Sequence, residues 1–292
     1  MASTLVSSAL RLDVAGVPAV DGLTFATTGQ HVILVGAPRV LFHAAAGVHV
    51  TARGTLTVAG LTPKCAVRTG VAASAALDPV LPSQWTPRQL ATWSARLADH
   101  PRSVGRELAA DALRRVGLDS LADSRLGGLP LTAKRAAVLA AALATGATTL
   151  LVEWSASALV DPQARALSRI FARAMSDRHT LVFSERMSLD SPLALASDEA
   201  IVLDGSDVLA QDVPAEIASR TRSLMLRVVG SVDLFVRTLE ASGGRAERGA
   251  MTARTEHLRV DLGPLSTSDV FRIAAESRAV VFELRPLSGV FA

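Results

Sequence analysis

The sequence predicts an α/β protein with a parallel sheet, followed by a smaller α+β unit. Two continuous apolar runs, at 31–36 and 179–184, are typical of strands that are buried on both faces of a sheet. Helical stretches separate such strands, and an order in which strands and helices alternate favours a parallel sheet. Near Pro214 the pattern changes, and a second, shorter series of strands and helices begins.

The N-terminal part is expected to consist mostly of strands. Residues 10–14 and 22–27 alternate apolar and polar side chains, which predicts antiparallel strands with one solvent-exposed face. Gly36 ends the buried run at 31–36 and opens a turn, after which residues 41–47 predict a short helix closed by glycine. Two further short strands are expected between residues 48 and 58.

The middle of the first unit is helical. Thr86 and Pro87 predict a helix start, because the threonine hydroxyl can cap a free amide and proline has no amide to leave unbonded. Leu90, Trp93 and Leu97 are expected to line the buried face of this helix. The remaining elements are expected as helices at 105–116, 134–143 and 162–175, and as buried strands at 148–152 and 179–184.

The second unit has the order strand, helix, strand, strand, helix, strand, which is the ferredoxin-like βαββαβ arrangement. Its elements are expected at 224–229, 232–241, 245–250, 257–262, 268–276 and 279–284. The predicted domains are therefore residues 1–219, with a helical subdomain at about 84–135, and residues 220–292.

Charge and composition exclude several classes of function. The 292 residues carry 30 lysines and arginines against 27 acids, and this balance, with few interleaved aromatic residues, does not predict nucleic-acid binding. The single cysteine and the lack of a basic stretch after Met1 predict a cytoplasmic location. The six histidines show no metal-ligand spacing, so no metal is expected. The uncharged run 136–152 is interpreted as helix, turn and strand, not as a membrane span.

With its elements in this order, the first unit resembles the ATP-binding domain of ABC transporters. The resemblance spans nearly all of residues 5–217 and depends on the order and spacing of many short segments. It implies an ABC-type nucleotide-binding-domain-like fold with antiparallel strands, a mixed or parallel core sheet and a helical subdomain. The segments that carry it are 32–36, 44–47, 134–135 with the alanine-rich helix that follows, 150–153, 157–162 and 197–203.

The second unit looks like the small C-terminal extension of many ATPase subunits of ABC-2-type exporters. The likeness includes an ending similar to theirs at residues 284–291. Membership of that family would imply ATP and Mg²⁺ as ligands and a membrane permease as partner.

The residues that would bind the nucleotide are missing. In a G-x-x-x-x-G-K-[ST] loop, amides surround the phosphates, the lysine neutralises them and the hydroxyl holds Mg²⁺. The chain has only two lysines, Lys64 and Lys134, and the Gly, Lys and Ser/Thr positions counted from Gly36 are residues 41–43, Leu-Phe-His. Ser74 is the residue expected in place of the metal-sensing glutamine, although Gln84 lies not far off. The vestigial nucleotide-binding positions are Gly36, Ala37, Pro38, Arg39 and Ser74.

Other positions of the family pattern are also replaced. Val152 stands in place of the Mg²⁺-holding aspartate, so Glu153 occupies the general-base position without a metal ligand beside it. Glu153 is interpreted mainly as a strand-end acid that caps or pairs, and Arg39 as a solvated arginine. Residues 129–131, Leu-Pro-Leu, cannot offer the hydrogen bonds of the LSGGQ signature. Glu185 stands at the switch-histidine position, where an anion would repel a γ-phosphate.

One element remains recognisable. Ser157, Ala158, Leu159 and Asp161 resemble the loop that touches the partner subunit in the family, which fits selection for assembly. A helix start with Asp161 as cap and Pro162 at the first position explains Asp161 and Pro162 equally well. The large side chains at positions 42 and 154, Phe and Trp, could fill the nucleotide cleft but also suit the core.

These losses predict a catalytically inactive ABC ATPase-like subunit, a pseudo-ATPase that acts as scaffold or regulator of an ABC-type membrane transporter. No cofactor is expected, since charge-assisted hydrogen bonds of about 1.5–3 kcal/mol each are lost. The expected partners are an active ABC ATPase subunit, an integral membrane permease or both, with a homodimer as a further option. The chain would then lie at the inner face of the cell membrane.

Two alternatives stay open. The first is a weakly active ATP-binding and hydrolysing transporter subunit with a non-standard site that uses Arg39 and Glu153. The second is a non-transport regulatory or assembly protein that uses the C-terminal subdomain.

Overall fold

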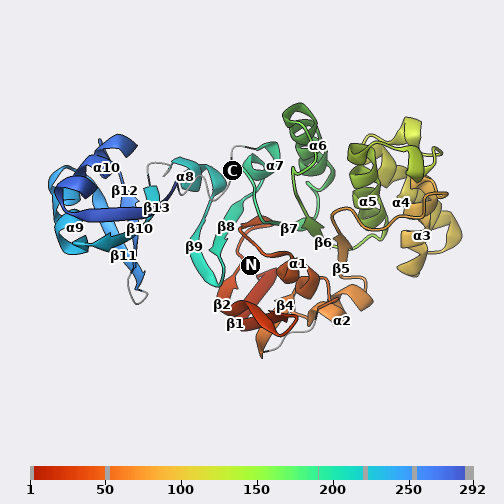
Figure 1. Ribbon diagram of the computed structural model, residues 1–292. Helices are drawn as coiled ribbons and strands as arrows, with labels where there is room; N and C mark the ends of the chain where they lie inside the picture. The colour runs from red at the N-terminus through yellow and green to blue at the C-terminus, as the bar shows by residue number, and fades with distance from the viewer. Residues whose placement is uncertain (1–2, 50–52, 190, 220–222, 252–254, 287–292) are drawn as a thin grey trace. The chain divides into compact units, whose positions relative to one another are not determined.

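The computed structural model describes residues 3–49, 53–189, 191–219, 223–251 and 255–286 (Figure 1). The chain divides into two compact units, residues 1–214 and 215–292. The division falls slightly before the expected boundary at residue 220, at the start of helix α8 (Pro214–Ser219).

A six-stranded sheet forms the centre of the first unit (Figure 1). Its strands follow the order β5-β6-β7-β3-β8-β9, and all neighbouring pairs are parallel except β8 and β9, which are antiparallel. All five residues of β6 are buried, which confirms the expectation of a strand covered on both faces. The strands are β3 (His31–Val35), β5 (Ala72–Ala75), β6 (Thr149–Glu153), β7 (His179–Ser184), β8 (Glu199–Asp204) and β9 (Asp207–Asp212).

A three-stranded antiparallel sheet of order β2-β1-β4 packs with the N-terminal helices over the same core. Its strands are β1 (Leu5–Val14), β2 (Val17–Ala26) and β4 (Arg53–Val58), and the helices are α1 (Arg39–Ala45) and α2 (Pro63–Arg68). Part of the expected strand region at 48–58 lies outside the described residues, namely positions 50–52. Side chains from both sheets, with Leu41 and Phe42 of α1, form one hydrophobic cluster.

Three helices build the helical subdomain: α3 (Pro87–Leu97), α4 (Arg102–Arg115) and α5 (Leu131–Ala144). The helix start at Thr86 is confirmed, since its hydroxyl accepts from the amide of Gln89 in a complete capping box. The predicted buried face of α3 is wrong. Ala91 and Ala95 are buried, while Trp93 and Leu97 are 52% and 69% exposed.

Close packing explains why alanines replace the larger side chains in this interface. Helix α3 contacts both α4 and α5. At Gly105 of α4, an added Cβ would lie 3.4 Å from the Cβ of Ala95. Helices that approach this closely have room only for small residues, so the tertiary contacts override the preference of large apolar side chains for burial.

The uncharged run 136–152 forms the end of α5, a turn and β6, as expected. Two further helices complete the unit, α6 (Asp161–Ala174) and α7 (Pro192–Leu195). Among the described residues, no helix is both long enough and apolar enough to cross a bilayer.

After α8, the described residues of the second unit form a four-stranded antiparallel sheet with helices α9 and α10. Its sheet order is β11-β12-β10-β13, and its core joins the inner faces of the strands to helices α9 and α10. The elements are β10 (Ser223–Gly230), α9 (Val232–Ala241), β11 (Arg245–Met251), β12 (Glu256–Asp261), α10 (Thr267–Glu276) and β13 (Ala279–Pro286). The expected family-like ending continues into residues 287–291, which lie outside the described residues.

Candidate functional site

Only three residues, Gly36, Ala37 and Pro38, connect β3 to α1 at the phosphate-loop position. The amide of Ala37 donates to the carbonyl of Ser184 on β7 at 3.2 Å, and Pro38 has no amide to offer. Gly36 has a φ of +76°, and a Cβ there would lie 2.0 Å from the carbonyl oxygen of Leu203. The connection is therefore tied to its neighbouring strands and does not form an open loop of amides.

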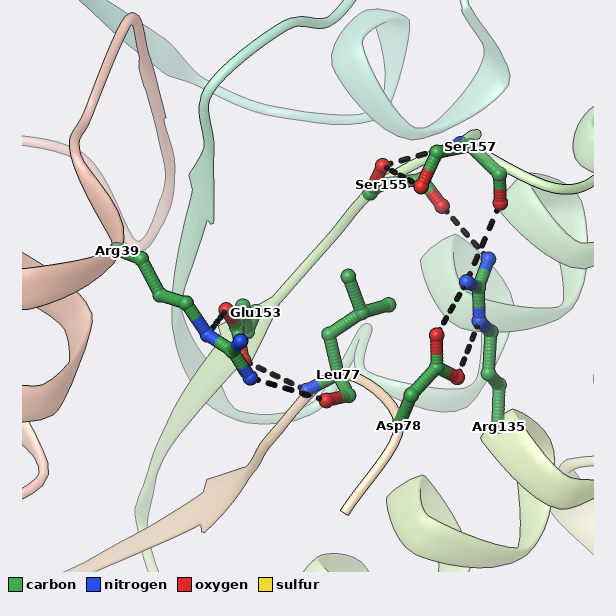
Figure 2. A network of polar contacts seen from close by, with 7 residues as sticks. All are labelled: Arg39, Leu77, Asp78, Arg135, Glu153, Ser155 and Ser157. Carbon is green, nitrogen blue, oxygen red and sulfur yellow. Dashed lines mark hydrogen bonds and ion pairs between the residues drawn. The ribbon is translucent and has the colours of Figure 1, made fainter.

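Arg39, the first residue of α1, forms an ion pair with Glu153 at the end of β6 (Figure 2). The Arg39 Nε lies 2.7 Å from Glu153 Oε1, and the amide of Leu77 donates to Glu153 Oε2 at 2.8 Å. Arg39 also donates to the carbonyl of Leu77 at 3.4 Å. The interpretation of Glu153 as an acid that pairs is correct. Arg39 is an exposed arginine, as expected, with a side chain that is 56% exposed, and it also pairs with Glu153.

Glu153 is nearly buried and already has partners on both oxygens. The side chain is only 9% exposed, Oε1 forms the ion pair with Arg39, and Oε2 accepts the hydrogen bond from the amide of Leu77. The two residues of the non-standard ATPase alternative, Arg39 and Glu153, thus bind each other in this structure.

A second polar network lies beside the first and is centred on Arg135 of α5 (Figure 2). The Arg135 side chain is 5% exposed and makes two hydrogen bonds to Asp78, at 2.9 and 2.7 Å. It also donates to the carbonyls of Ser155 at 2.8 Å and Ser157 at 3.2 Å. Its hydrogen bonds hold the pKa of Asp78 below the ordinary value of 3.8.

Sequence reasoning missed this role of Arg135. In the sequence, Arg135 is only part of the segment 134–135, which contributes to the family resemblance. The signal was one arginine close to the start of a helix otherwise rich in alanine and leucine, because a buried arginine requires partners for its donors. Its partners come from two segments far apart in sequence, at 78 and at 155–157, so the contact could not be read from local pattern.

The loop with the expected subunit-interface residues is exposed and internally bonded. Ser155 donates to the Ser157 hydroxyl at 2.7 Å, and Ala158 has a φ of +63°. Asp161 is the first residue of α6, and the N-cap is Val160, without a side-chain hydrogen bond. The interpretation of Asp161 as the helix cap is therefore wrong. The interface role of Ser157, Ala158, Leu159 and Asp161 stays a prediction.

Two other predicted positions lie apart from these networks. Ser74 is an exposed residue inside β5, and the residues after the strand, Leu77 and Asp78, make the contacts just described. Glu185 is exposed directly after β7, where Ser184 binds the carbonyl of Arg186 through its hydroxyl at 2.7 Å.

The signature region forms a short 3₁₀ turn (Leu126–Gly128) before α5. Leu129 is buried, and Pro130 is the N-cap of α5 without a side-chain hydrogen bond. A pocket of about 370 Å³ lies here, lined by apolar side chains and by the charged residues Asp78, Lys134 and Arg135. The two large side chains considered for the cleft are core residues: Phe42 packs on Phe183 and Trp154 on Phe171, with ring centroids 5.7 and 5.2 Å apart.

At 36–38 the amide of Ala37 is bonded to Ser184 and Pro38 has no amide, and the Arg39 guanidinium is paired with Glu153. Among the described residues, no group of three or more His, Cys, Asp or Glu side chains could hold a metal ion.

Comparison with known proteins identifies the fold. The CbiO1 protein of Clostridium perfringens, part of the ABC transporter complex CbiONQ, has a TM-score of 0.64 at 18% identity, over 75% of this chain and 92% of that one. MJ1267, an ATP-binding cassette of an ABC transporter, has a TM-score of 0.63 at 14% identity, and the match covers 75% of this chain and 95% of that one. An ATP-binding subunit of an ABC transporter has a TM-score of 0.60 at 14% identity, and the match covers 75% of this chain and 93% of that one.

Comparison of the sequence with family models gives no match, and comparison with curated proteins gives none. The chain therefore has the α/β fold of ABC-type nucleotide-binding domains, and the structural likeness carries the fold alone.

Proposed function

We propose that this protein is a catalytically inactive ABC ATPase-like subunit that acts as a scaffold or regulator of an ABC-type membrane transporter. The observation that carries the proposal is the three-residue connection from β3 to α1, in which Ala37 binds Ser184 and Arg39 binds Glu153. A phosphate needs several free amides and a cation at this place. Here the amide of Ala37 is bonded, Pro38 has no amide, and the Arg39 guanidinium is paired with Glu153.

The remaining replacements support the same proposal. Val152 is a fully buried apolar residue at the position of the metal-holding aspartate. For the γ-phosphate of a facing subunit, Leu129 has no side-chain donor and its amide is bonded to the carbonyl of Leu126, and Pro130 has no amide donor. The chain would lack its own site and also fail to complete that of a partner, which favours a docking role over half of a mixed ATPase pair.

The partners of this proposal are an active ABC ATPase subunit, an integral membrane permease or both, at the inner face of the cell membrane; a homodimer is the third option. The exposed loop with Ser157 and Asp161 is the proposed subunit contact. We interpret the second unit as a ferredoxin-like subdomain of the kind found on ABC-2-type exporter ATPases, because its βαββαβ order and 2-3-1-4 strand arrangement agree with that topology.

Titration calorimetry with Mg-ATP tests the loss of chemistry. We expect no heat of binding at micromolar concentrations for the full chain or for Arg39→Ala, because removal of one side chain does not rebuild the loop. Micromolar binding by the full chain would favour the weakly active alternative. Binding gained only in Arg39→Ala would show that the Arg39 side chain alone blocks a functional site.

Copurification tests the transporter role. The tagged chain should recover a permease or an intact ABC ATPase from its own cells, and recovery of neither would contradict this role. The non-transport alternative rests on β13, an edge strand with Val280 and Phe282 exposed at 58% and 74%. If that alternative holds, Phe282→Ser should abolish an interaction of the chain while transport proteins remain absent from the purified complex.

A further inference from the structure

A groove of about 670 Å³ lies on the helical subdomain, along α3 and the start of α4. None of the residues that line it is acidic. Its lining includes two tryptophans and four arginines: Trp85, Trp93, Arg88, Arg96, Arg102 and Arg106. The volume is in the range of ligand and peptide sites on proteins, about 300–1,000 Å³.

Three of the four guanidinium groups have no carboxylate partner among the described residues. Arg88 is neutralised by two hydrogen bonds to Asp123, at 2.8 and 2.9 Å. Arg96 only reaches the carbonyl of His100, at 3.5 Å. No ion pair within 4.0 Å joins Arg102 or Arg106 to an acid in the part of the chain that the structure describes. The groove therefore carries unbalanced positive charge.

The aromatic part of the groove is exposed as well. Trp85 and Trp93 meet edge to face, with ring centroids 5.8 Å apart at 76°. Trp93 is 52% exposed, and Leu97, one turn further along α3, is 69% exposed. Tryptophan and arginine are the residues most enriched at the energetic centres of protein interfaces. The indole edge and the guanidinium groups together suit a partner that is both aromatic and anionic.

Stability does not explain this arrangement. Arg102 is the first residue of α4, where the positive end of the helix dipole disfavours a cation. The N-cap is Pro101, which makes no side-chain hydrogen bond, and the first turn holds no acid. Arg102 and Arg106 are four residues apart, so their like charges repel across one turn. Such local costs without a structural gain are expected where a surface serves a partner.

We propose that this groove binds an acidic segment of a partner protein, with carboxylates on its three unpaired guanidinium groups and an aromatic side chain on Trp93. The charge complementarity favours a peptide over a nucleic acid, because the chain has a net charge of only +3 and its two indoles pack on each other. A concave site with few cations also fits a lipid surface less well than a peptide. The proposal does not rest on the transporter role. The outcome of the Mg-ATP titration therefore leaves peptide binding in this groove unaffected.

Fluorescence anisotropy with a labelled random copolymer of glutamate and tyrosine tests the proposal on the full chain. Polyglutamate, polyuridylate and phosphatidylserine vesicles serve as the other probes. The test variant is the double charge reversal Arg102→Glu with Arg106→Glu. The matched control reverses Arg165 and Arg169, two exposed arginines with the same spacing on α6. Thermal unfolding of each variant checks that it is folded.

The expected result is binding of the copolymer that weakens at least about tenfold in the groove variant and less than about threefold in the control. Trp93→Ala should remove the preference for the copolymer over polyglutamate. Equal loss in both double variants, no copolymer binding, or tighter groove-dependent binding of polyuridylate or vesicles would overturn the proposal.

Discussion

At the carboxyl end of β6, Arg39 forms an ion pair with Glu153, and the amide of Leu77 donates a hydrogen bond to the same carboxylate. In the groove along α3 and α4, by contrast, Arg102 and Arg106 are exposed and form no ion pair with an acid of the described residues. Both regions belong to the first unit and both are rich in arginine. In the first the protein satisfies its own charges, and in the second it leaves them for another molecule.

This contrast has a physical basis. A buried carboxylate must be paired, because transfer of a bare charge from water into a protein interior is costly. An exposed guanidinium keeps its hydration and can remain unpaired at little cost until a partner arrives. Arg39 and Glu153 therefore have a structural task in this chain, whereas the groove keeps guanidinium groups free for recognition.

The largest expected effect concerns the connection between β3 and α1. Gly36→Ala should lower the free energy of unfolding by about 3–5 kcal/mol, since it combines a strained positive φ with a clash against the Leu203 carbonyl. Gly16→Ala is the control, because its φ is +79° but no atom lies within 4 Å of the added Cβ. It should cost about 1–2 kcal/mol in urea unfolding. Equal costs would mean that the connection has room to open.

The next effect concerns the buried arginine. Arg135→Met should destabilise the first unit by about 2–3 kcal/mol, because it leaves the Ser155 and Ser157 carbonyls without their donor. Arg114→Ala, which removes an exposed pair with Asp111, should change stability by no more than about 0.5 kcal/mol. Urea unfolding measures both. If Arg135→Met lowers the free energy of unfolding as little as Arg114→Ala does, the contacts of Arg135 do not stabilise this region.

A pH dependence follows from Asp78. Its pKa is lower in the folded protein than the ordinary 3.8, so the unfolded state binds more protons in that range and stability rises with pH. The contribution is therefore present above about pH 4 and is lost as the pH falls below that value. Asp78→Asn should flatten the loss of stability between about pH 6 and pH 3 in urea unfolding. In the Arg135→Met background the same substitution should change the slope much less.

The smallest effect concerns the groove. Arg102→Glu should raise the free energy of unfolding by about 0.3–1 kcal/mol, because it places an acid at the positive end of α4. Arg106 lies beyond the first turn of α4, so Arg106→Glu should raise the free energy of unfolding by less. Thermal unfolding measures both variants. A loss of stability in Arg102→Glu would show that Arg102 stabilises α4. The arginines of both regions would then have a structural role.

Much of the fold was predictable because local pattern decides it. The strand at 179–184 was placed with its observed bounds, and the helix at 232–241 likewise. The start of α3 followed from Thr86 and Pro87, whose capping chemistry acts within a single turn. The buried face of α3 was predicted wrongly. It depends on how closely neighbouring helices approach, and Ala91 and Ala95 show that this distance favours small residues.

The candidate site divides in the same way. The sequence alone was enough to exclude a lysine in a Gly-Lys-Ser/Thr string, because that is a statement about residue identity at a fixed spacing. The pairing of Arg39 with Glu153 and of Arg135 with Asp78 was decided by tertiary structure. These contacts join segments 57 or more residues apart, and only the packing of α1 and α5 around the sheet brings their charges together. The groove arose in the same way, since it exists only where α4 packs beside α3 and leaves the larger side chains of α3 outside.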